Sequence, residues 1–446
     1  MKTPLSRRSF LRHTGLASVA AFAFPAILRS QAAGGESPNE RLNIAFVGVG
    51  GRGKAAVRGL KDHNRVVFCD VDQDYPAEIY QEYPDVPRVQ DYRRMFDRYA
   101  NQIDAVTVST PDHMHYPIAL AALQLGKHVF VEKPLTHTIW EARQLARLAG
   151  EKKVATIMGN QGHANEGPRL LKEWIDAGVL GEVRELHSWT DRPIWPQGVR
   201  APDHSKFIPV VPPSLDWDLW LGVAAERPYD PAYVPFKWRG YWDFGTGALG
   251  DMGCHIMDGA FWALGLDAPQ RIAAISGRAN GLSAPTSSMI TFDFPARGGR
   301  PALRWTWYDG GLQPPLPDGW EAERKFPENG TLVVGSKATV LANTYYDSVR
   351  IVPEARMREL APALPAKTLP RVEGGHFAEW VRACKGGPAA GSDFQYAAKL
   401  TELCLLSNVA VRTRRPVEWD AAAMRVTNLP DANQYLTKQY RAGFGV

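Results

Sequence analysis

The stretch Arg41–His63, RLNIAFVGVGGRGKAAVRGLKDH, decides the fold of this chain. It begins with a run of apolar residues, passes through closely spaced glycines and continues with the apolar and charged pattern of a helix. Gly48, Gly50 and Gly53 have the spacing G-x-G-x-x-G. In a strand-to-helix turn, the first glycine allows a tight bend, the second lets a phosphate approach the backbone, and the third lets the helix pack closely on the strand. We therefore expect a phosphate-binding turn at the N-terminus of a helix.

The acid that follows this turn indicates which dinucleotide binds. A second apolar run, RVVFCDVD, contains Asp70. A carboxylate at this place accepts hydrogen bonds from the ribose hydroxyls and repels a 2′-phosphate. The pattern thus predicts NAD rather than NADP. A glycine turn in an α/β domain that binds no nucleotide is the alternative.

Three further β-rich runs alternate with helical stretches. They are AVTVSTP (105–111), HVFVEKP (128–134) and VATIMGNQG (154–162). Strands that alternate with helices predict a parallel sheet that is buried on both faces. We expect an α/β fold with a five-stranded Rossmann domain over residues 40–160.

Polar residues follow the third strand, at the sheet edge where open α/β sheets bind ligands. Ser109, Thr110 and Pro111 end this strand, and His113 and His115 come next. Because no third metal ligand is near, we expect the two histidines to start a helix or to contact the cofactor. We expect no metal site.

The fourth strand ends in Lys133, which stands between Glu132 and a proline that keeps the lysine extended. A lysine in a partly desolvated cleft can bind a substrate hydroxyl or polarise a developing carbonyl. A solvated loop lysine is the alternative.

The order of the motifs resembles one protein family. G-x-G-x-x-G, Asp70, STPDHMH, EKP and the D-x-G-x-H of residues 251–255 follow one another as in the Gfo/Idh/MocA family, named for glucose–fructose oxidoreductase and inositol dehydrogenase. The resemblance covers nearly the whole chain after residue 40. It implies a C-terminal α+β domain over 161–420, whose open, mainly antiparallel sheet helps to form a homodimer or homotetramer. Residues 421–446 would be a C-terminal extension.

The resemblance also implies the catalytic residues, which are Lys133, Asp251 and His255. In the family, the matching residues surround the nicotinamide and the substrate. The chemistry agrees, because oxidation of a secondary alcohol needs a hydride acceptor, which NAD supplies, and a proton acceptor, for which a histidine is suited. On a continuous helix, Asp258 would share the face of Asp251 and His255 and support the imidazole. An amphipathic helix with incidental polar residues and a metal site are the alternatives.

Two sets of binding residues complete the expected site. Those expected to contact the cofactor are Gly48, Gly50, Gly51, Arg52, Gly53, Asp70, Ser109, Thr110, Pro111, His113, His115, Glu132, Lys133 and Gln161. The Pro- and Trp-rich segment 190–247 is too apolar to be disordered, and it precedes Asp251, so we expect it to wall the substrate site. The candidate substrate residues are Arg192, Trp195, His204 and Asp258.

The N-terminus has the features of a twin-arginine signal peptide over residues 1–33. Arg7 and Arg8 precede the apolar run Leu16–Leu28, which is shorter than the roughly 20 residues that cross a membrane. Small residues follow, as at a cleavage site. We expect the twin-arginine machinery to export the folded protein to the periplasm or beyond, with no stable membrane insertion after cleavage. A short membrane anchor is the alternative.

Charge and cysteine content limit the other possible partners. The net charge is +5, but Lys and Arg are spread along the chain, so we expect no nucleic-acid partner. The four cysteines fit no zinc spacing and are expected to be mostly buried free thiols; they are Cys69, Cys254, Cys384 and Cys404.

These features predict an exported, NAD-dependent oxidoreductase that acts on a secondary alcohol of a sugar, a cyclic polyol or a derivative. Because free NAD is scarce outside the cytoplasm, the cofactor would be held tightly and recycled. Alternatively, the protein is a glycoside hydrolase that oxidises its substrate transiently. A nucleotide- or sugar-binding protein without turnover is a third possibility.

Overall fold

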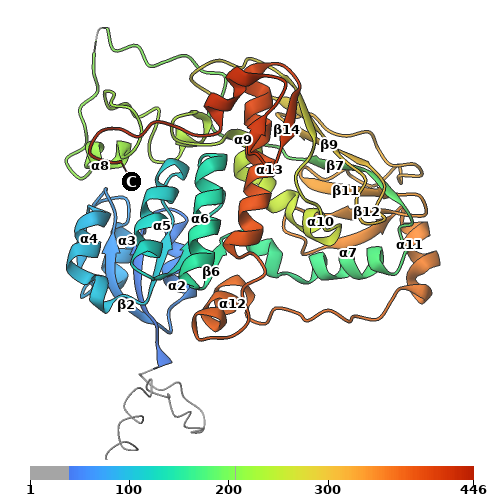
Figure 1. Ribbon diagram of the computed structural model, residues 1–446, viewed down its shortest axis with the longest axis horizontal. Helices are drawn as coiled ribbons and strands as arrows, with labels where there is room; N and C mark the ends of the chain where they lie inside the picture. Colours follow the sequence, from blue (N-terminus) through green and yellow to red (C-terminus); the bar gives the residue numbers. More distant parts are fainter. Residues whose placement is uncertain (1–39, 206, 446) are drawn as a thin grey trace, which may run out of the picture. The chain divides into compact units, whose positions relative to one another are not determined.

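The structure, a computed structural model, describes residues 40–205 and 207–445. The expected signal peptide at 1–33 lies outside these residues. The chain from Leu42 onward packs as one unit, and its architecture follows from two β-sheets (Figure 1).

The first sheet is parallel, with six strands in the order β3-β2-β1-β4-β5-β6 within the described chain. In chain order, the strands are β1 (Asn43–Val47), β2 (Asn64–Cys69), β3 (Arg88–Val89), β4 (Ala105–Val108), β5 (His128–Val131) and β6 (Thr156–Met158). The strand order reverses between β1 and β4, as in a Rossmann domain. The expected parallel α/β sheet is confirmed, but we expected five strands, because the two residues of β3 are too few to form a readable apolar run.

Helices cover both faces of this sheet. They are α2 (Gly53–Gly59), α3 (Ala77–Glu82), α4 (Tyr92–Tyr99), α5 (His115–Gln124), α6 (Ile139–Lys152) and, from much later in the chain, α12 (Gly375–Cys384). Ala45 and Val47 share a buried cluster with α4, α5 and α6. Ile44 and Phe46 belong to a second cluster with α2, α3 and Trp380 of α12. Successive residues of β1 therefore point to opposite faces, and both faces are covered.

The second sheet has nine strands in the described residues, in the order β13-β12-β11-β7-β10-β9-β8-β14-β15. They are β7 (Val183–Trp189), β8 (Arg271–Ser276), β9 (Ser288–Phe294), β10 (Leu303–Asp309), β11 (Gly330–Gly335), β12 (Thr339–Ala342), β13 (Val349–Val352), β14 (Val417–Asp420) and β15 (Arg425–Val426). The helices that accompany it are α7 (Glu166–Asp176), α9 (Gly247–Ile256), α10 (Asp258–Ala263) and α11 (Glu354–Leu360). β7 and β10 pair in parallel, whereas the other neighbouring pairs are antiparallel. This confirms the expected open, mainly antiparallel sheet.

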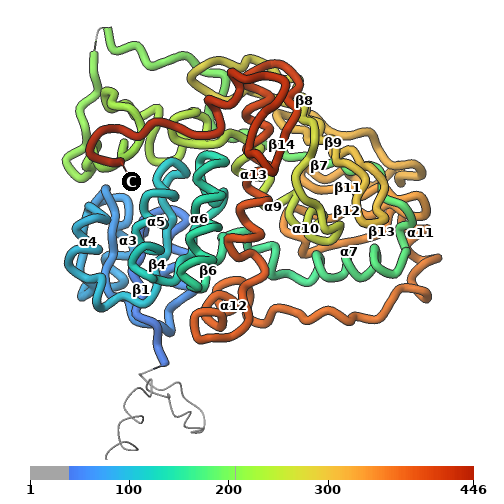
Figure 2. The backbone as a smooth tube through the Cα atoms, viewed as in Figure 1, coloured from blue at the N-terminus to red at the C-terminus, as the bar shows by residue number. Residues whose placement is uncertain are grey.

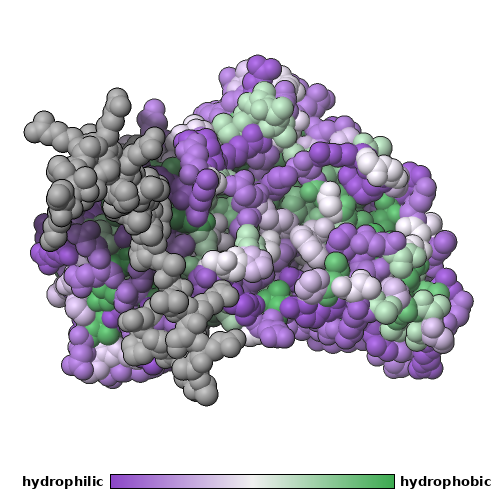
Figure 3. All heavy atoms as spheres, turned by 60° about the horizontal axis from the view of Figure 1, so that its bottom comes forward, coloured by the Kyte–Doolittle hydropathy of each residue, from purple (hydrophilic) through white to green (hydrophobic). Residues whose placement is uncertain are grey.

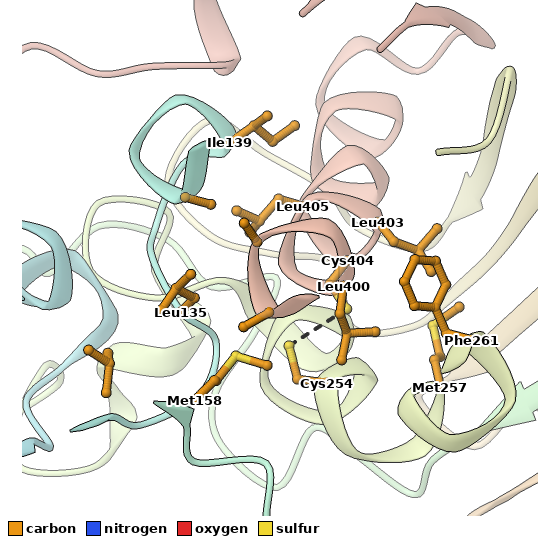
Figure 4. Close-up of a cluster of buried hydrophobic side chains, with 14 of the residues drawn as sticks. Leu135, Ile139, Met158, Cys254, Met257, Phe261, Leu400, Leu403, Cys404 and Leu405 are labelled. Carbon is orange, nitrogen blue, oxygen red and sulfur yellow. Dashed lines mark hydrogen bonds between the residues drawn. The ribbon is translucent and has the colours of Figure 1, made fainter. Parts of the chain in front are cut away.

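One long helix connects the two sheets. α13 (Phe394–Thr413) packs against α6, which covers the first sheet, and against α9 and β8, which belong to the domain of the second sheet. Figure 4 shows the buried side chains around it, which include Leu135, Ile139, Met158, Cys254, Met257, Phe261, Leu400, Leu403, Cys404 and Leu405. Because these residues form one continuous hydrophobic cluster, the two sheets share a core.

The four cysteines are free thiols. Cys254 of α9 and Cys404 of α13 place their sulfur atoms 3.8 Å apart within the shared core. Three of the four are buried and Cys384 is half-buried, which confirms the expectation from sequence.

Two segments lie outside the sheets and reach the carboxyl edge of the first one. The insert, residues 190–246, contains α8 (Trp217–Leu221) and an aromatic core of its own. Backbone hydrogen bonds tie it to the loop after β2, from the N–H of Asp216 to the carbonyl of Val71 and from the N–H of Gln73 to that of Ser214. The tail, residues 436–445, runs from the end of the chain's last turn towards α8 (Figure 2).

The surface of the described residues is mainly polar on the face drawn in Figure 3, where apolar side chains form separate patches. Patches of this kind are usual on proteins and need no partner to explain them. Of the helices within the described ranges, none is both long and apolar enough to cross a membrane.

Candidate active site

A cavity of about 400 Å³ lies at the carboxyl edge of the first sheet. The loops that follow β1, β2, β4 and β5 line it from one side. The other walls come from α9, through Asp251, from the insert, through Trp220 and Arg239, and from the tail, through Phe444. Open α/β sheets bind ligands where the strand order reverses, and this cavity lies there.

The glycine turn after β1 leaves no room for side chains. Gly48 has a φ of +77°, and a Cβ on it would lie 2.6 Å from the carbonyl oxygen of Ser109. A Cβ on Gly53 would lie 1.8 Å from the carbonyl oxygen of Gly48. Gly50 and Gly51 line the cavity itself. The turn therefore offers a bare backbone at the N-terminus of α2, which is the form that binds a pyrophosphate.

Asp70 is held against this turn. One of its carboxylate oxygens accepts hydrogen bonds from the N–H groups of Val49 and Gly50, at 2.9 and 3.2 Å. The other accepts from the N–H of Asp72 at 3.1 Å. Burial raises the pKa of Asp70 to about 6, although these hydrogen bonds favour the ionised form. At neutral pH the group is a carboxylate that lines the cavity, which favours ribose hydroxyls over a 2′-phosphate.

Two hydroxyl groups at the end of β4 indicate that the cavity fits a polar ligand. The side-chain oxygens of Ser109 and Thr110 are buried and have no hydrogen-bond partner among the described residues. Both residues line the cavity, together with Pro111. Buried polar atoms are usually paired, so a ligand with polar groups would satisfy them. This agrees with the dinucleotide that the glycine turn and Asp70 predict.

Arg52 and Glu132 connect the glycine turn with the end of β5. The Nε of Arg52 donates to a carboxylate oxygen of Glu132 at 3.2 Å. Burial raises the pKa of Glu132, and the charge of Arg52 partly opposes this rise. Both residues line the cavity, and their contact with the cofactor stays a prediction.

Lys133 and Asp251 meet across the cavity. The Nζ of Lys133 lies 2.9 Å from a carboxylate oxygen of Asp251 and 2.8 Å from its main-chain oxygen. Arg239, from the insert, places its Nε 3.1 Å from the same carboxylate oxygen. Burial alone would raise the pKa of Asp251, but the charges of Lys133 and Arg239 outweigh it and lower the pKa to about 2. The structure thus brings together two of the three expected catalytic residues and adds Arg239.

A second carboxyl group lies beside this pair. Asp112 is 4% exposed, lines the cavity and accepts a hydrogen bond of 2.8 Å from the hydroxyl of Thr246, just before α9. Burial and the negative charge of Asp251 raise the pKa of Asp112 to about 7, against the opposing charge of Lys133. A carboxyl group of this kind exchanges its proton near neutral pH, which is useful in proton-transfer chemistry.

His255 lies one turn after Asp251 on α9 and is 5% exposed. Its ring meets that of Tyr345 edge-on at 5.0 Å, and its Nδ1 has no hydrogen-bond partner among the described residues. Burial, and then the charge of Lys133, lower the pKa of His255 well below 6.5, although Asp251 opposes this. The ring is therefore neutral. The residues that line the cavity include Asp251 but not His255.

The expectation that Asp258 supports His255 is wrong, because the helix does not continue. The carbonyl of Ile256 accepts hydrogen bonds from the hydroxyls of Thr331 and Tyr346, at 2.7 and 3.0 Å. The N–H of Ala260, which would bond that carbonyl in a continuous helix, donates instead to Tyr346. α9 therefore ends at Ile256, and Asp258 begins α10.

Asp258 instead belongs to a buried cluster. Its carboxylate lies 2.9 Å from Nδ1 of His163 and accepts a hydrogen bond of 2.6 Å from the hydroxyl of Tyr396. It is 1% exposed and does not line the cavity.

His113 and His115 are buried, contact backbone carbonyl groups through their ring nitrogens, and do not line the cavity. Nε2 of His113 lies 3.0 Å from the carbonyl oxygen of Trp220 in the insert. The two ring nitrogens of His115 lie 2.8 and 2.9 Å from the carbonyl oxygens of Pro134 and Thr110. His115 thus fixes the ends of β4 and β5 relative to each other, which positions Thr110 and Lys133.

The remaining expected residues do not line the cavity either. Their side chains bind neighbours: Arg192 pairs with Asp191, Trp195 donates to Gln197, and His204 lies 3.0 Å from Asp230. Gln161 lies at the start of the turn after β6, with its buried side-chain oxygen unpaired among the described residues. The described residues contain no group of three or more His, Cys, Asp or Glu that could hold a metal ion.

Sequence reasoning missed Asp112, Arg239, Tyr75 and Phe444, all of which line the cavity. Asp112 had a usable signal, because it directly follows the Ser-Thr-Pro that ends β4. Arg239 and Phe444 had none, because the insert and the tail reach the cavity only through tertiary packing.

Comparison with known protein families matches two segments of the chain. Residues 42–160 match the model described as "Oxidoreductase family, NAD-binding Rossmann fold". Residues 195–281 match the model described as "Oxidoreductase family, C-terminal alpha/beta domain".

Individual relatives also match over parts of the chain. Levoglucosan dehydrogenase of Pseudarthrobacter phenanthrenivorans is 23% identical over 237 residues, which are 51% of this chain and 52% of that protein. Glycosyl hydrolase family 109 protein 1 of Shewanella sp. strain ANA-3 is 32% identical over 157 residues, which are 32% of this chain and 34% of that protein. The chain spans about half the length, or less, of the curated relatives it matches.

Among solved structures, the WlbA dehydrogenase from Bordetella pertussis, in complex with NADH and UDP-GlcNAcA, has a similar fold. The TM-score is 0.58 at 14% sequence identity, over 85% of this chain and 99% of that one. At this identity the likeness concerns the fold alone.

Proposed function

We propose that the protein is an NAD-dependent oxidoreductase of the Gfo/Idh/MocA family, because residues 42–160 and 195–281 match two models of that family. Its substrate is a sugar, a cyclic polyol or a derivative. The enzyme oxidises a secondary alcohol of this substrate, or reduces the corresponding ketone in the reverse reaction. The observation that carries this proposal is the Lys133–Asp251 pair in the cavity that also holds the glycine turn and Asp70.

The geometry divides the cavity into two ends. Asp70 follows β2 and Lys133 follows β5, and β1 and β4 lie between these strands. A dinucleotide laid across the glycine turn therefore has its adenosine ribose at Asp70 and its nicotinamide towards Lys133. When bound, NAD supplies a hydride acceptor at that second end.

Lys133 and Asp251 are the residues that would handle the substrate. A lysine ammonium has three N–H donors, and Lys133 directs two contacts at Asp251. The third is available to hold a substrate hydroxyl and to stabilise alkoxide character as its proton leaves. Arg239 shares the charge of Asp251, so the carboxylate stays ionised and can accept from a neighbouring hydroxyl.

Two groups beside this pair can take the alcohol proton. His255 is neutral, but burial holds its pKa well below 6.5 and it does not line the cavity, so it is the weaker candidate of the two. Asp112 has its pKa near 7 and lines the cavity, so it can pass a proton onward from the Lys133–Asp251 pair.

The test is to purify the protein without added cofactor, denature a sample and identify any released nucleotide by mass spectrometry. The native sample is assayed in parallel on panels of free sugars, polyols and glycosides. Reduction of added NAD by a free sugar or polyol supports the proposal. Folded protein that neither contains nor binds NAD would refute it.

A second candidate function is supported by the 32% identity to a glycosyl hydrolase family 109 protein. Here, oxidation at one carbon acidifies the neighbouring C–H, elimination expels the glycosidic group, water adds, and the hydride returns to the same carbon. This route needs no pair of catalytic carboxylates and consumes no NAD. Cleavage of a glycoside without net NADH formation distinguishes it from a dehydrogenase.

We also propose export by the twin-arginine route, based on Arg7 and Arg8. Replacement of both arginines by lysine keeps the charge. It should leave the protein in the cytoplasm of a host that exports the unchanged chain, as measured by cell fractionation. Equal export of the two forms would contradict this proposal.

The resemblance to the family further supports a homodimer or homotetramer through the C-terminal sheet. Light scattering during gel filtration measures this directly, and a monomer at all concentrations would exclude it.

A further inference from the structure

The tail is anchored along the first domain before it reaches the cavity. Lys438 places its Nζ 3.2 Å from a carboxylate oxygen of Glu141 on α6. Tyr440 donates a hydrogen bond of 2.7 Å to the same oxygen, and its ring stacks on that of Tyr116 on α5 at 6.2 Å. Glu141 is fully buried. These contacts fix the path that the red tube follows in Figure 2.

The end of the tail is held by two arginines. Arg441 binds the insert, with its Nη1 2.5 Å from a carboxylate oxygen of Asp218 and its Nε donating to the carbonyl of Gly222 at 2.9 Å. Arg93 of α4 donates to the carbonyl of Gly443 at 2.9 Å. Their guanidinium carbons lie 4.5 and 4.4 Å from the centre of the Phe444 ring, so both cations contact this aromatic side chain.

Phe444 therefore belongs to the cavity wall and is only 6% exposed. It lines the cavity together with Asp91 and Tyr92, which precede or begin α4, and with Leu219 of α8. These elements surround the end of the cavity that Asp70 occupies rather than the end with Lys133. The insert closes the same end, because it pairs with the loop after β2 at Val71 and Gln73.

We propose that the segment Lys438–Phe444 is part of the cofactor site. It forms a wall at the adenosine end and slows the release of NAD. This inference rests on the proposed function, because it assumes that NAD is the occupant. An apolar ring held at that end contacts the nucleotide and shields it from water, so loss of the ring should let the cofactor leave faster.

The test measures NADH release from the full-length protein. The protein is loaded with NADH and mixed with a large excess of NAD⁺, and the fluorescence of bound NADH is followed with time. The variants are Phe444→Ala and a chain that ends at Ala442, which keeps Lys438, Tyr440 and Arg441. Phe444→Leu retains an apolar side chain and serves as an intermediate case. The matched control is Phe207→Ala, because Phe207 is 69% exposed and does not line the cavity.

We expect release about tenfold faster from Phe444→Ala and from the shortened chain, which is the usual size of the loss of one aromatic contact with a base. The rate of NADH release from Phe444→Leu should lie between the rates of these two variants and that of the unchanged protein. Phe207→Ala should release NADH at the same rate as the unchanged protein. Thermal unfolding without cofactor confirms that each variant is folded.

The outcomes separate the two proposals. Release at the unchanged rate from both Phe444→Ala and the shortened chain, with NADH still bound, overturns the role of the tail alone. Folded, unchanged protein that binds no NADH overturns the proposed function and this inference with it.

Discussion

The chemical role of Lys133 depends on its ionic contact with Asp251 and on the residue that holds Asp251 in place. Lys133 is half-buried and meets Asp251, and the carboxylate of Asp251 is also held by Arg239. The positive charges keep this buried carboxylate ionised, with its pKa near 2. The result is a fixed cation and a fixed anion facing one space, in which a hydroxyl can be bound and deprotonated.

Replacement of Lys133 by alanine should abolish most turnover and leave cofactor binding intact. Loss of a single preorganised donor typically lowers kcat by about 100- to 1000-fold, whereas the glycine turn and Asp70 remain in place. Steady-state kinetics and NADH titration measure the two effects separately. Lys61→Ala, at an exposed position, is the control. Turnover at the original rate in Lys133→Ala would show that the catalytic assignment is wrong.

Replacement of Asp112 by asparagine should stabilise the protein in a manner that depends on pH. The pKa of Asp112 is about 7 in the folded state, against 3.8 for an ordinary Asp. A raised carboxyl pKa means that the folded state binds the proton more tightly, so stability is lost as pH rises from about 4 through 7. Asparagine does not ionise and avoids this loss.

We expect the gain in unfolding free energy from Asp112→Asn to be roughly 3 kcal/mol larger at pH 8 than at pH 5. Urea unfolding of cofactor-free protein at the two pH values measures it. The exposed Asp97→Asn provides the comparison. A gain of the same size at both pH values would show that Asp112 does not titrate as the structure indicates.

The glycine turn and α9 place these residues by close packing of backbone. α9 begins with a glycine at φ +70° and carries Gly253, where a Cβ would lie 2.8 Å from the sulfur of Cys404 on α13. The helix can thus approach α13 closely, and this approach brings Asp251 to the cavity. α2 approaches β1 in the same way, through Gly53.

Gly53→Ala should therefore damage cofactor binding more than stability. The added Cβ would meet the carbonyl oxygen of Gly48 at 1.8 Å, so the turn must move away from the conformation that exposes its N–H groups. We expect NADH affinity to fall by at least about tenfold, because the phosphate contacts of the turn are misplaced. Fluorescence titration measures it. Gly281→Ala is the control, because its Cβ meets nothing within 4 Å; an equal, small effect of both would count against the assigned turn.

The two sheets share their largest hydrophobic cluster. α13 lies between them, and the cluster shown in Figure 4 contains residues of the Rossmann domain, α9, α10 and α13. The tail adds a second connection, because it crosses α5 and α6 and ends at the insert.

We therefore expect one cooperative unfolding transition for the chain from Leu42 onward. Scanning calorimetry should give a calorimetric enthalpy equal to the van't Hoff enthalpy. Saturating NAD should shift the whole transition upwards. Two resolved transitions, of which NAD shifts only one, would show that the domains unfold separately.

Much of this architecture could be predicted from sequence, because its signals are local. The glycine turn, Asp70 and Lys133 each stand within or at the end of a recognisable apolar strand, and their neighbours in sequence determine their positions. The parallel sheet follows from the alternation of strand-like and helical runs, whereas the mainly antiparallel sheet was expected from the family resemblance.

The rest depended on contacts between distant segments. Asp258 was misplaced because hydroxyls of Thr331 and Tyr346, far along the chain, end α9 at Ile256. Arg239 was missed for the same reason, since only folding of the insert brings it to Asp251. The hydrophobic pattern of one segment does not indicate which residue of a distant segment its side chains will contact.

The position of Phe444 has a practical consequence for anyone who prepares this protein. Affinity tags are commonly fused to the end of a chain, where they are assumed to be harmless. Here, Phe444 itself is part of the cavity wall, so a tag joined shortly after it would crowd the nucleotide pocket or pull the aromatic ring out of it. A preparation labelled at that end could lose its nucleotide during purification and be mistaken for an inactive protein.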